Sequence, residues 1–330
     1  MKQVLVTGGA GFIGSVVAGT LADHEMFSVV VCDWFGDGDK WRNLSKHRVL
    51  EVIHPEQLDE WLALRTKDLG GIVHLGASSS TTETDVDFIL KNNFTQSRKL
   101  WSWAAEHQIP FIYASSAATY GDGSAGFDDD ISKEYLNRLR PMNPYGWSKW
   151  LFDQYVSLAI ERGHKLPPQW AGLRFFNVYG PNEYHKGEQK SVAANIFPHA
   201  AQGRPVHLFK SYNPAYEDGG QMRDFIYVKD CVSVIAWLLK NPQVSGLFNV
   251  GSGKARSFKD LANALFAALG KPMQATYYDM PEGLKTKYQY FTEAKMDRLR
   301  AAGYPIPFMS LEEGIKDYVQ NYLAKPDKYF

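Results

Sequence analysis

A tyrosine and a lysine one helical turn apart have the chemistry to exchange a proton with an alcohol. Tyr145 and Lys149 occur in a Tyr-Gly-Trp-Ser-Lys run that follows Pro144. Pro144 suits the first position of a helix, so both side chains are expected on one helix face. An ammonium about 5 Å from a phenol favours the phenolate by roughly 3 kcal/mol, which lowers the tyrosine pKa by roughly two pH units. The spacing predicts a proton-transferring tyrosine, although the pattern alone also fits an ordinary helix with a surface lysine.

A glycine-rich turn near the start of the chain predicts a dinucleotide site. Gly8, Gly11 and Gly14 lie between an expected buried strand at residues 4–6 and an apolar stretch that suits a helix. Glycine permits the tight turn and lets backbone N–H groups approach a pyrophosphate, which the helix dipole also favours.

Charged residues after the second expected strand bear on which dinucleotide binds. Asp33 ends the strand expected at residues 29–32, about 20 residues past the glycine turn, where a carboxylate binds the hydroxyls of the adenosine ribose. Asp33 favours NAD, whereas the cations Lys40 and Arg42 that follow it suit the 2′-phosphate of NADP. From these residues, both dinucleotides stay open.

The order of the expected elements predicts an α/β fold with a doubly wound parallel sheet. Strands and helices alternate as far as residue 175. The strands are expected at residues 4–6, 29–32, 48–53, 71–75, 111–114 and 170–175, with helices at 56–64 and 86–106 among the connections. Ligands lie beyond the carboxyl ends of such strands, so a serine of the Ser115-Ser116 pair is expected beside Tyr145. His74, inside the fourth strand, is expected to be satisfied within the sheet.

The second half of the chain is less regular and predicts a smaller, discontinuous α/β substrate domain. Residues 1–176 and 222–252 are expected to form the dinucleotide-binding domain, and residues 177–221 and 253–330 the substrate domain. Later elements are expected as a strand at 206–209, an extended run at 223–228 and helices at 258–269 and 311–323.

The composition argues against several classes of partner. Thirty-six basic residues balance 36 acidic ones, so the formal net charge of zero favours neither nucleic acid nor an anionic membrane. No apolar run reaches about 18 residues, and the first residues have no signal-peptide layout. Two cysteines provide no disulfide framework, and no metal-ligand spacing occurs. A cytoplasmic protein without a bound metal is expected.

Four motifs in this order resemble the extended short-chain dehydrogenase/reductase superfamily. They are the glycine turn, Ser115-Ser116, Tyr145-x-x-x-Lys149 and Arg223-Asp224-Phe225. The segments Ser78-Ser79-Ser80-Thr81-Thr82-Glu83 and His185-Lys186-Gly187 are similar, more narrowly, to the ADP-L-glycero-D-manno-heptose 6-epimerase family, over nearly the whole chain. This resemblance implies an enzyme that inverts C6 of the heptose in ADP-D-glycero-D-manno-heptose, for the inner core of lipopolysaccharide. The inversion would use transient oxidation by tightly bound NADP and return of the hydride to the opposite face.

The resemblance also implies roles for individual residues. Tyr145 and Lys186 would transfer protons from two sides of the sugar, Ser116 would bond the reacting oxygen, and Lys149 would tune Tyr145. Burial and Lys149 would lower the pKa of Lys186. The implied cofactor-binding residues are Gly8, Gly11, Phe12, Ile13, Gly14, Asp33, Trp34, Lys40, Leu75, Gly76, Ala77, Ser78, Ser79, Asn92, Lys149, Val178 and Lys186. The implied substrate-binding residues are Asn177, Ser116, Asn195, Phe209, Arg223 and Tyr288.

Departures from the family pattern keep alternatives open. Pro55 stands about where a lysine helps bind the 2′-phosphate, so NAD is an alternative to NADP. A nucleotide-hexose 4-epimerase needs the same serine, tyrosine and lysine, and a dinucleotide-sensing protein without turnover is a rival of another class. Ala117-Ala118 stands where 4,6-dehydratases carry an acid, which argues against elimination. The resemblance implies a homo-oligomer, with a pentamer as the expected form.

Overall fold

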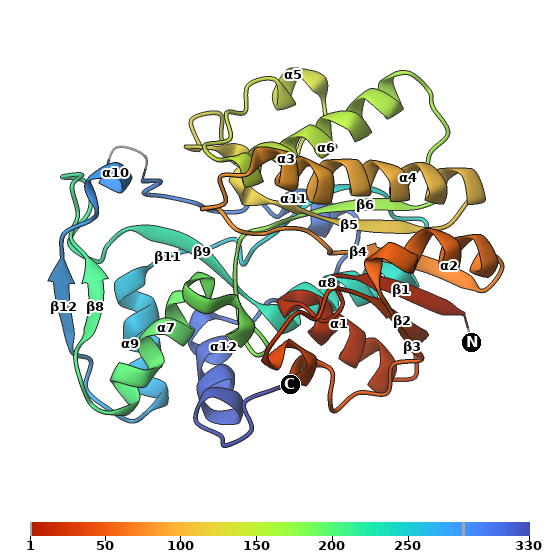
Figure 1. Ribbon diagram of the computed structural model, residues 1–330. Coiled ribbons are helices and arrows are strands. Elements are labelled where there is room, and N and C mark those ends of the chain that lie inside the picture. The colour runs from red at the N-terminus through yellow and green to blue at the C-terminus, as the bar shows by residue number, and fades with distance from the viewer. Residues whose placement is uncertain (1, 286–287) are drawn as a thin grey trace.

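The computed structural model describes residues 2–285 and 288–330, and a seven-stranded parallel sheet forms its larger part (Figure 1). In spatial order its strands are β10 (Gly246–Val250), β6 (Trp170–Phe175), β5 (Phe111–Ser116), β4 (Leu69–His74), β1 (Gln3–Thr7), β2 (Ser28–Cys32) and β3 (Glu51–Ile53). The strand order reverses between β1 and β4, which is the switch point where ligands bind in such sheets. The prediction of a doubly wound parallel sheet is confirmed.

Helices cover both faces of this sheet because its strands are apolar on both sides. On β1, Leu5 packs with Trp101 and Phe152 on one face, while Val4 and Val6 belong to the core on the other. The helices are α2 (Leu58–Arg65), α4 (Gln96–His107) and α6 (Pro144–Glu161) on the first face, and α1 (Phe12–Asp23) and α8 (Val228–Lys240) on the second (Figure 1). The 3-10 turns η1 (Asp39–Asn43) and η2 (Pro55–Gln57) flank β3.

The helix expected at residues 86–106 forms in three parts. α3 (Val86–Ile89) runs into a π-helical stretch, η3 (Leu90–Thr95), which continues as α4. Such wide turns are frequent at functional sites, and this one carries Asn92 and Asn93.

A smaller region lies beside the carboxyl ends of the sheet (Figure 1). It holds a three-stranded sheet of β11 (Ala255–Ser257), β9 (Met222–Tyr227) and β7 (Asn177–Tyr179), and a two-stranded sheet of β12 (Ala275–Tyr278) and β8 (Val206–Phe209). Its main helices are α7 (Val192–Ala201), α9 (Phe258–Ala268) and α12 (Leu311–Tyr318), which continues as η6 (Val319–Leu323). The remaining short helices, which are not confined to this region, are η4 (Ala117–Tyr120), α5 (Lys133–Leu136), η5 (Tyr184–Gln189), α10 (Glu282–Lys285) and α11 (Asp297–Ala301). β10 joins the main sheet whereas β9 does not, and the division into two domains stays a prediction.

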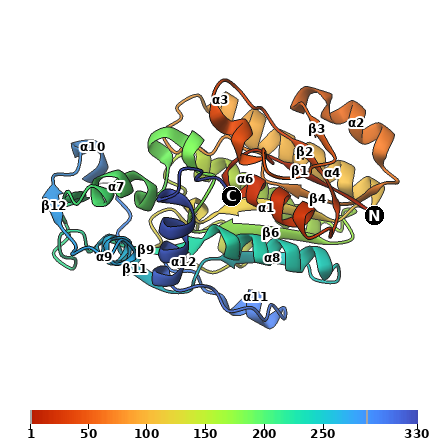
Figure 2. The same cartoon turned by 90° about the horizontal axis from the view of Figure 1, so that it is seen from below.

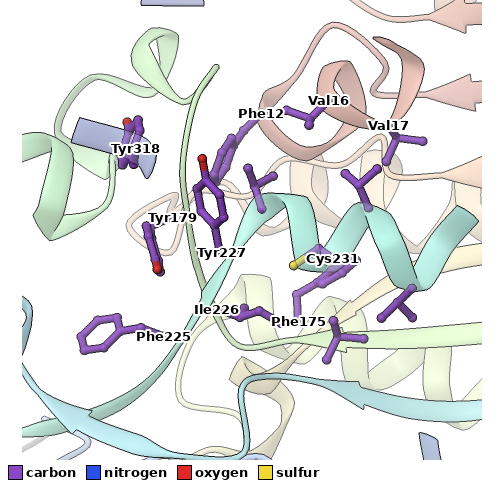
Figure 3. Close-up of a cluster of buried hydrophobic side chains, with 14 of the residues drawn as sticks. Phe12, Val16, Val17, Phe175, Tyr179, Phe225, Ile226, Tyr227, Cys231 and Tyr318 are labelled. Carbon is purple, nitrogen blue, oxygen red and sulfur yellow. The ribbon is translucent and has the colours of Figure 1, made fainter. Parts of the chain in front are cut away.

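One buried cluster connects the two regions (Figure 3). It runs from Phe12 of α1 through Cys231 of α8 to Tyr179, Tyr227 and Tyr318, with the ring centroids of Tyr179 and Tyr227 5.4 Å apart. Seen from below, the C-terminal end of the chain lies between α12 and α1 (Figure 2). Across residues 2–285 and 288–330, no helix combines the length and apolarity that a membrane crossing requires.

Candidate active site

The start of α6 sets the position of Tyr145 and Lys149. Asn143 caps the helix, because its side chain accepts a hydrogen bond of 2.8 Å from the Gly146 N–H. A Cβ atom on Gly146 would lie 2.6 Å from the Ala118 carbonyl oxygen, so glycine lets the helix approach the turn that follows Ser116. Lys149 is buried one turn further on and donates a hydrogen bond of 2.9 Å to the Ala114 carbonyl. Tyr145, Ser116 and Lys149 thus line one cavity.

Burial changes the acidity of this pair in a way that the sequence did not predict. Desolvation raises the pKa of Tyr145, and a hydrogen bond with Ser116 offsets part of that rise. Desolvation also lowers the pKa of Lys149 to about 8, against the opposing charge of Asp153. The predicted lowering of the tyrosine pKa is therefore wrong for this structure, because the loss of water around the phenol is the largest cause of the shift and Ser116, rather than Lys149, opposes it. Tyr145 is a protonated phenol at neutral pH.

The glycine turn requires glycine at its two ends. Gly8 adopts φ +67°, and a Cβ atom there would lie 2.6 Å from the Gly76 nitrogen, at the end of the neighbouring strand. A Cβ atom on Gly14 would lie 2.1 Å from the Gly8 carbonyl oxygen. The turn is therefore closed tightly onto the first turn of α1, and its glycines line the cavity together with Phe12 and Ile13 at the start of that helix. This shape fits the phosphates of a dinucleotide.

Asp33 is engaged on both carboxylate oxygens. One oxygen accepts a hydrogen bond of 2.8 Å from the Ala10 N–H of the glycine turn, and the other accepts bonds of 2.7 Å from the Trp34 N–H and from Lys40 Nζ. Lys40 also donates to the Trp34 carbonyl. A carboxylate and an ammonium therefore stand together at the place expected for the adenosine ribose.

His74 is buried and bonded on both ring nitrogens, as expected of a histidine within the sheet. Nδ1 lies 2.6 Å from Thr7 Oγ1 and Nε2 lies 2.8 Å from Ser97 Oγ. Burial, together with the charge of Lys149, lowers the pKa of His74 to about 3, so the ring is neutral.

Asn93 supports the cavity wall and was missed by the sequence reasoning, which chose Asn92. The buried Asn93 amide bonds both the N–H and the carbonyl of Ser78, at 2.8 and 2.9 Å, and donates to Ser148 Oγ at 3.0 Å. Ser148 in turn donates to the Tyr145 carbonyl at 2.7 Å. Asn92 lines the cavity, and its amide donates to the Phe88 carbonyl. The signal for Asn93 in the sequence was its place as a polar residue on the inner, otherwise packed face of the expected helix.

Lys186 reaches the same cavity from η5. Its Nζ lies 5.7 Å from the ring centroid of Phe12, beside the glycine turn. Burial lowers the pKa of Lys186, and the charge of Glu183 opposes that shift. The expected desolvation is present, whereas the charged neighbour that acts on Lys186 is Glu183 rather than Lys149. A partly desolvated amine of this kind exchanges protons more readily than an exposed lysine.

A cavity of about 1090 Å³ is lined by the catalytic and cofactor-binding residues of the predicted site. Its lining includes the four expected catalytic residues, Ser116, Tyr145, Lys149 and Lys186. The expected cofactor-binding residues that line it are Gly8, Gly11, Phe12, Ile13, Gly14, Asp33, Trp34, Lys40, Leu75, Gly76, Ala77, Ser78, Ser79, Asn92, Lys149, Val178 and Lys186. Pro55, Glu56, His185 and Gln189 line it as well. The individual roles of these residues stay predictions.

The expected substrate-binding residues other than Ser116 lie outside this lining. Three of them gather in the smaller region: the Arg223 guanidinium lies 5.1 Å from the ring centroid of Tyr288, whose ring lies 6.3 Å from that of Phe209. Arg223 is 9% exposed, and desolvation lowers its pKa. Asn195 donates to the carbonyls of Glu188 and Lys190, so it supports the loop after Lys186. Asn177 is exposed at the start of β7.

Comparison with known proteins finds relatives that cover nearly the whole chain. The model of the NAD dependent epimerase/dehydratase family matches residues 4–251. The ADP-L-glycero-D-manno-heptose-6-epimerase of Fusobacterium nucleatum is 46% identical over 99% of this chain and 100% of its own length. The crystal structure of the Helicobacter pylori ADP-L-glycero-D-manno-heptose-6-epimerase superposes with a TM-score of 0.80 at 29% identity, covering 97% of this chain and 96% of that one. The UDP-N-acetylglucosamine 4-epimerase of Methanobrevibacter ruminantium reaches the same TM-score at 25% identity, covering 98% of both chains.

Proposed function

The chain belongs to the NAD dependent epimerase/dehydratase family, and from that premise we propose that it is an ADP-L-glycero-D-manno-heptose 6-epimerase. It inverts C6 of the heptose in ADP-D-glycero-D-manno-heptose. The observation that carries this proposal is that Tyr145 and Lys186 line one cavity together with the glycine turn. Two separate proton-handling groups are what an inversion needs, because the hydroxyl of the reacting carbon changes sides.

A nicotinamide dinucleotide fits the glycine turn and Asp33, and when bound it supplies the acceptor and donor of hydride. The turn holds its phosphates, and Asp33 with Lys40 meets the adenosine ribose. We favour NADP over NAD because the Lys40 ammonium, 2.7 Å from Asp33, provides a cation for a 2′-phosphate. Pro55 and Glu56, which also line the cavity, supply no second cation there. Native mass spectrometry of the purified protein tests this choice, since it identifies the dinucleotide that remains bound.

Tyr145 and Lys186 divide the proton transfers between them. Tyr145, kept protonated by burial, donates to the sugar oxygen at C6 in one orientation and recovers the proton in the reverse step. Ser116 holds the phenol by its hydrogen bond and orients the same oxygen. Lys186, whose pKa is lowered by burial, would take the proton of the C6 hydroxyl when the sugar presents its other face, and proton exchange with solvent would return both groups to their starting state. Lys149 binds the nicotinamide ribose and holds the strand end at Ala114.

The nucleotide end of the substrate is assigned to the smaller region. Arg223 presents a planar fork that matches two pyrophosphate oxygens, and the neighbouring rings of Tyr288 and Phe209 suit an adenine. Asn177 and Asn195 are proposed to contact the sugar nucleotide between this group and the cavity. We propose residues 177–221 and 253–330 as the substrate domain, to which Arg223 adds its guanidinium from strand β9 of the intervening segment.

Epimerisation of ADP-D-glycero-D-manno-heptose by the purified protein tests the proposal directly. We expect turnover of this compound and none of UDP-N-acetylglucosamine. The second candidate function, a nucleotide-hexose 4-epimerase, rests on the fold shared with the Methanobrevibacter ruminantium enzyme. Turnover of the UDP-sugar in preference to the ADP-heptose would replace the first proposal with the second.

The variant Tyr145→Phe distinguishes the two epimerase candidates from a dinucleotide-sensing protein without turnover. Loss of general acid–base catalysis lowers kcat by about 10²- to 10⁴-fold. The variant is expected to retain its dinucleotide, because the phenol hydroxyl bonds Ser116 rather than the glycine turn. An unchanged activity profile in this variant would favour the sensor. We also propose a homo-oligomer, whose subunit number the same native mass spectrum reports.

A further inference from the structure

Residues 327–330, far from the glycine turn in sequence, lie against the loop that carries Lys186. The Tyr184 hydroxyl donates a hydrogen bond of 2.8 Å to the Lys328 carbonyl, and the Tyr184 and Tyr329 rings meet edge to face at 5.4 Å. On the other side, Lys46 Nζ donates to the Tyr329 carbonyl at 2.7 Å, and the Arg42 guanidinium lies 5.1 Å from the Tyr329 ring. Tyr329 is 7% exposed, so this segment is packed between η1 and η5.

A pair of buried asparagines lies beneath this segment. Asn43, 1% exposed, donates to the carbonyls of Ala10 and Asn182 at 2.9 and 3.2 Å, and lies 3.2 Å from His185 Nδ1. Asn182, 0% exposed, donates to Ser15 Oγ and to the Asn43 carbonyl at 2.9 and 3.2 Å. The pair therefore joins the glycine turn and α1 to the residues just before Lys186.

Residues 327–330 complete the bonding of this pair. The Phe330 N–H donates a hydrogen bond of 2.9 Å to Asn182 Oδ1, so the amide oxygen as well as the amide nitrogen of Asn182 is bonded. Glu183 adds a second attachment, because it accepts hydrogen bonds from the Ser191 hydroxyl at 2.7 Å and the Tyr318 hydroxyl at 2.9 Å. The loop is thus fixed at Asn182 and Glu183, immediately ahead of Lys186.

We propose that the Asn43–Asn182 pair, closed by residues 327–330, is a positioning device that sets Lys186 over the glycine turn. Neither asparagine lines the cavity, so both act through the loop rather than on the sugar. The inference rests on the proposed function in one respect, namely the proton-transferring role of Lys186. The cofactor site and Lys186 are thereby held in a fixed relative position, although the glycine turn lies near the start of the chain and Lys186 lies in its second half.

The test uses Asn182→Gly in the full-length chain. Asn182 has φ +72°, which glycine adopts without strain, so this change removes the amide group while leaving the backbone conformation accessible. The matched control is Gln108→Gly. Gln108 has φ +56° and an amide that donates to the carbonyls of Ala105 and Leu166, at the end of α4. A second variant lacks Tyr329 and Phe330, and removes the partner of Asn182 Oδ1 without touching the pair itself.

The first measurement is the pKa of Lys186. It is obtained from the rate at which Lys186 is acylated at varied pH, with peptide mapping to identify the modified lysine. In the native chain, burial keeps the pKa of Lys186 below the ordinary lysine value. Both Asn182→Gly and the shortened chain are expected to return this pKa toward about 10.4, because the loop no longer holds the amine in the cavity. The control should titrate as the native chain does. A Lys186 titration that is identical in all four proteins would overturn the proposal.

The second measurement is epimerisation of the ADP-heptose. A displaced catalytic group is expected to lower kcat about tenfold or more with little change in KM. If the native chain fails to epimerise, the proposed function is refuted, while the titration of Lys186 still decides whether the pair positions it. Thermal unfolding of each variant by circular dichroism shows that the chains compared are folded. A loss of kcat in Gln108→Gly equal to that in Asn182→Gly would also count against the proposal.

Discussion

Replacing Asp153 by asparagine is expected to lower the melting temperature of the protein by several degrees. Asp153 and Arg174 form an ion pair at 2.9 Å in which both side chains are fully buried. The Asp153 carboxylate also accepts a hydrogen bond of 2.9 Å from the Ser115 hydroxyl, at the end of the strand that bears Ser116. Asp153→Asn leaves the guanidinium buried without its counter-charge. Breaking a buried pair in this way costs about 3–5 kcal/mol.

The size of the temperature shift follows from the length of the chain. At about 2.1 cal/mol/K of unfolding entropy per residue, 330 residues give about 0.7 kcal/mol/K, so Tm falls by about 4–7 °C. Circular dichroism at a fixed scan rate measures this shift. The double variant Asp153→Leu with Arg174→Met is expected to lose less, because no charge stays buried and unpaired. A Tm within about 1 °C of the native value for Asp153→Asn, as for an exposed pair, would refute the reasoning.

The same substitution is expected to move the pH dependence of activity. Burial lowers the pKa of Lys149 to about 8, and the charge of the Asp153 carboxylate opposes this shift. Without that carboxylate the pKa of Lys149 falls below this value, and the limb of the kcat/KM profile due to Lys149 moves to lower pH. A limb that stays in place or moves upward would show that the two groups do not interact.

Three further predictions concern the dinucleotide and the lysines. Gly14→Ala is expected to lose bound dinucleotide, measured by absorbance after heat release, because its Cβ would lie 2.1 Å from the Gly8 oxygen. Lys40→Ala is expected to weaken NADP binding about ten- to hundredfold while sparing NAD, as one charge-assisted hydrogen bond is lost; equal losses for both would contradict this. For Lys149, whose folded pKa of about 8 lies below the ordinary 10.5, the unfolded chain binds more protons between those values. Stability due to this group therefore rises with pH across that window, and Lys149→Met should abolish the rise in unfolding free energy measured with denaturant.

Local sequence patterns predicted most of the elements that carry the site. The helix expected from Pro144 runs from Pro144 to Glu161, and the strand expected at 170–175 spans those residues. Both predictions depend on periodicity and capping, which act over a few neighbouring residues. The short strands β7, β11 and β12 were missed, because each has only three or four residues and forms by pairing with a distant segment. The identity of the side chains that line the cavity followed from motifs that mark strand ends and turns.

The sequence by itself determined the alternation of strands and helices, the glycine turn and the helical spacing of Tyr145 and Lys149. These features depend on residues that are close in the chain. Only the tertiary structure decided that the pKa of Tyr145 rises rather than falls, because desolvation depends on which segments cover the phenol. It also decided that Asn93 holds Ser78, and that residues 327–330 close over the loop of Lys186. Such contacts join segments far apart in sequence, and no local pattern encodes which of them will meet.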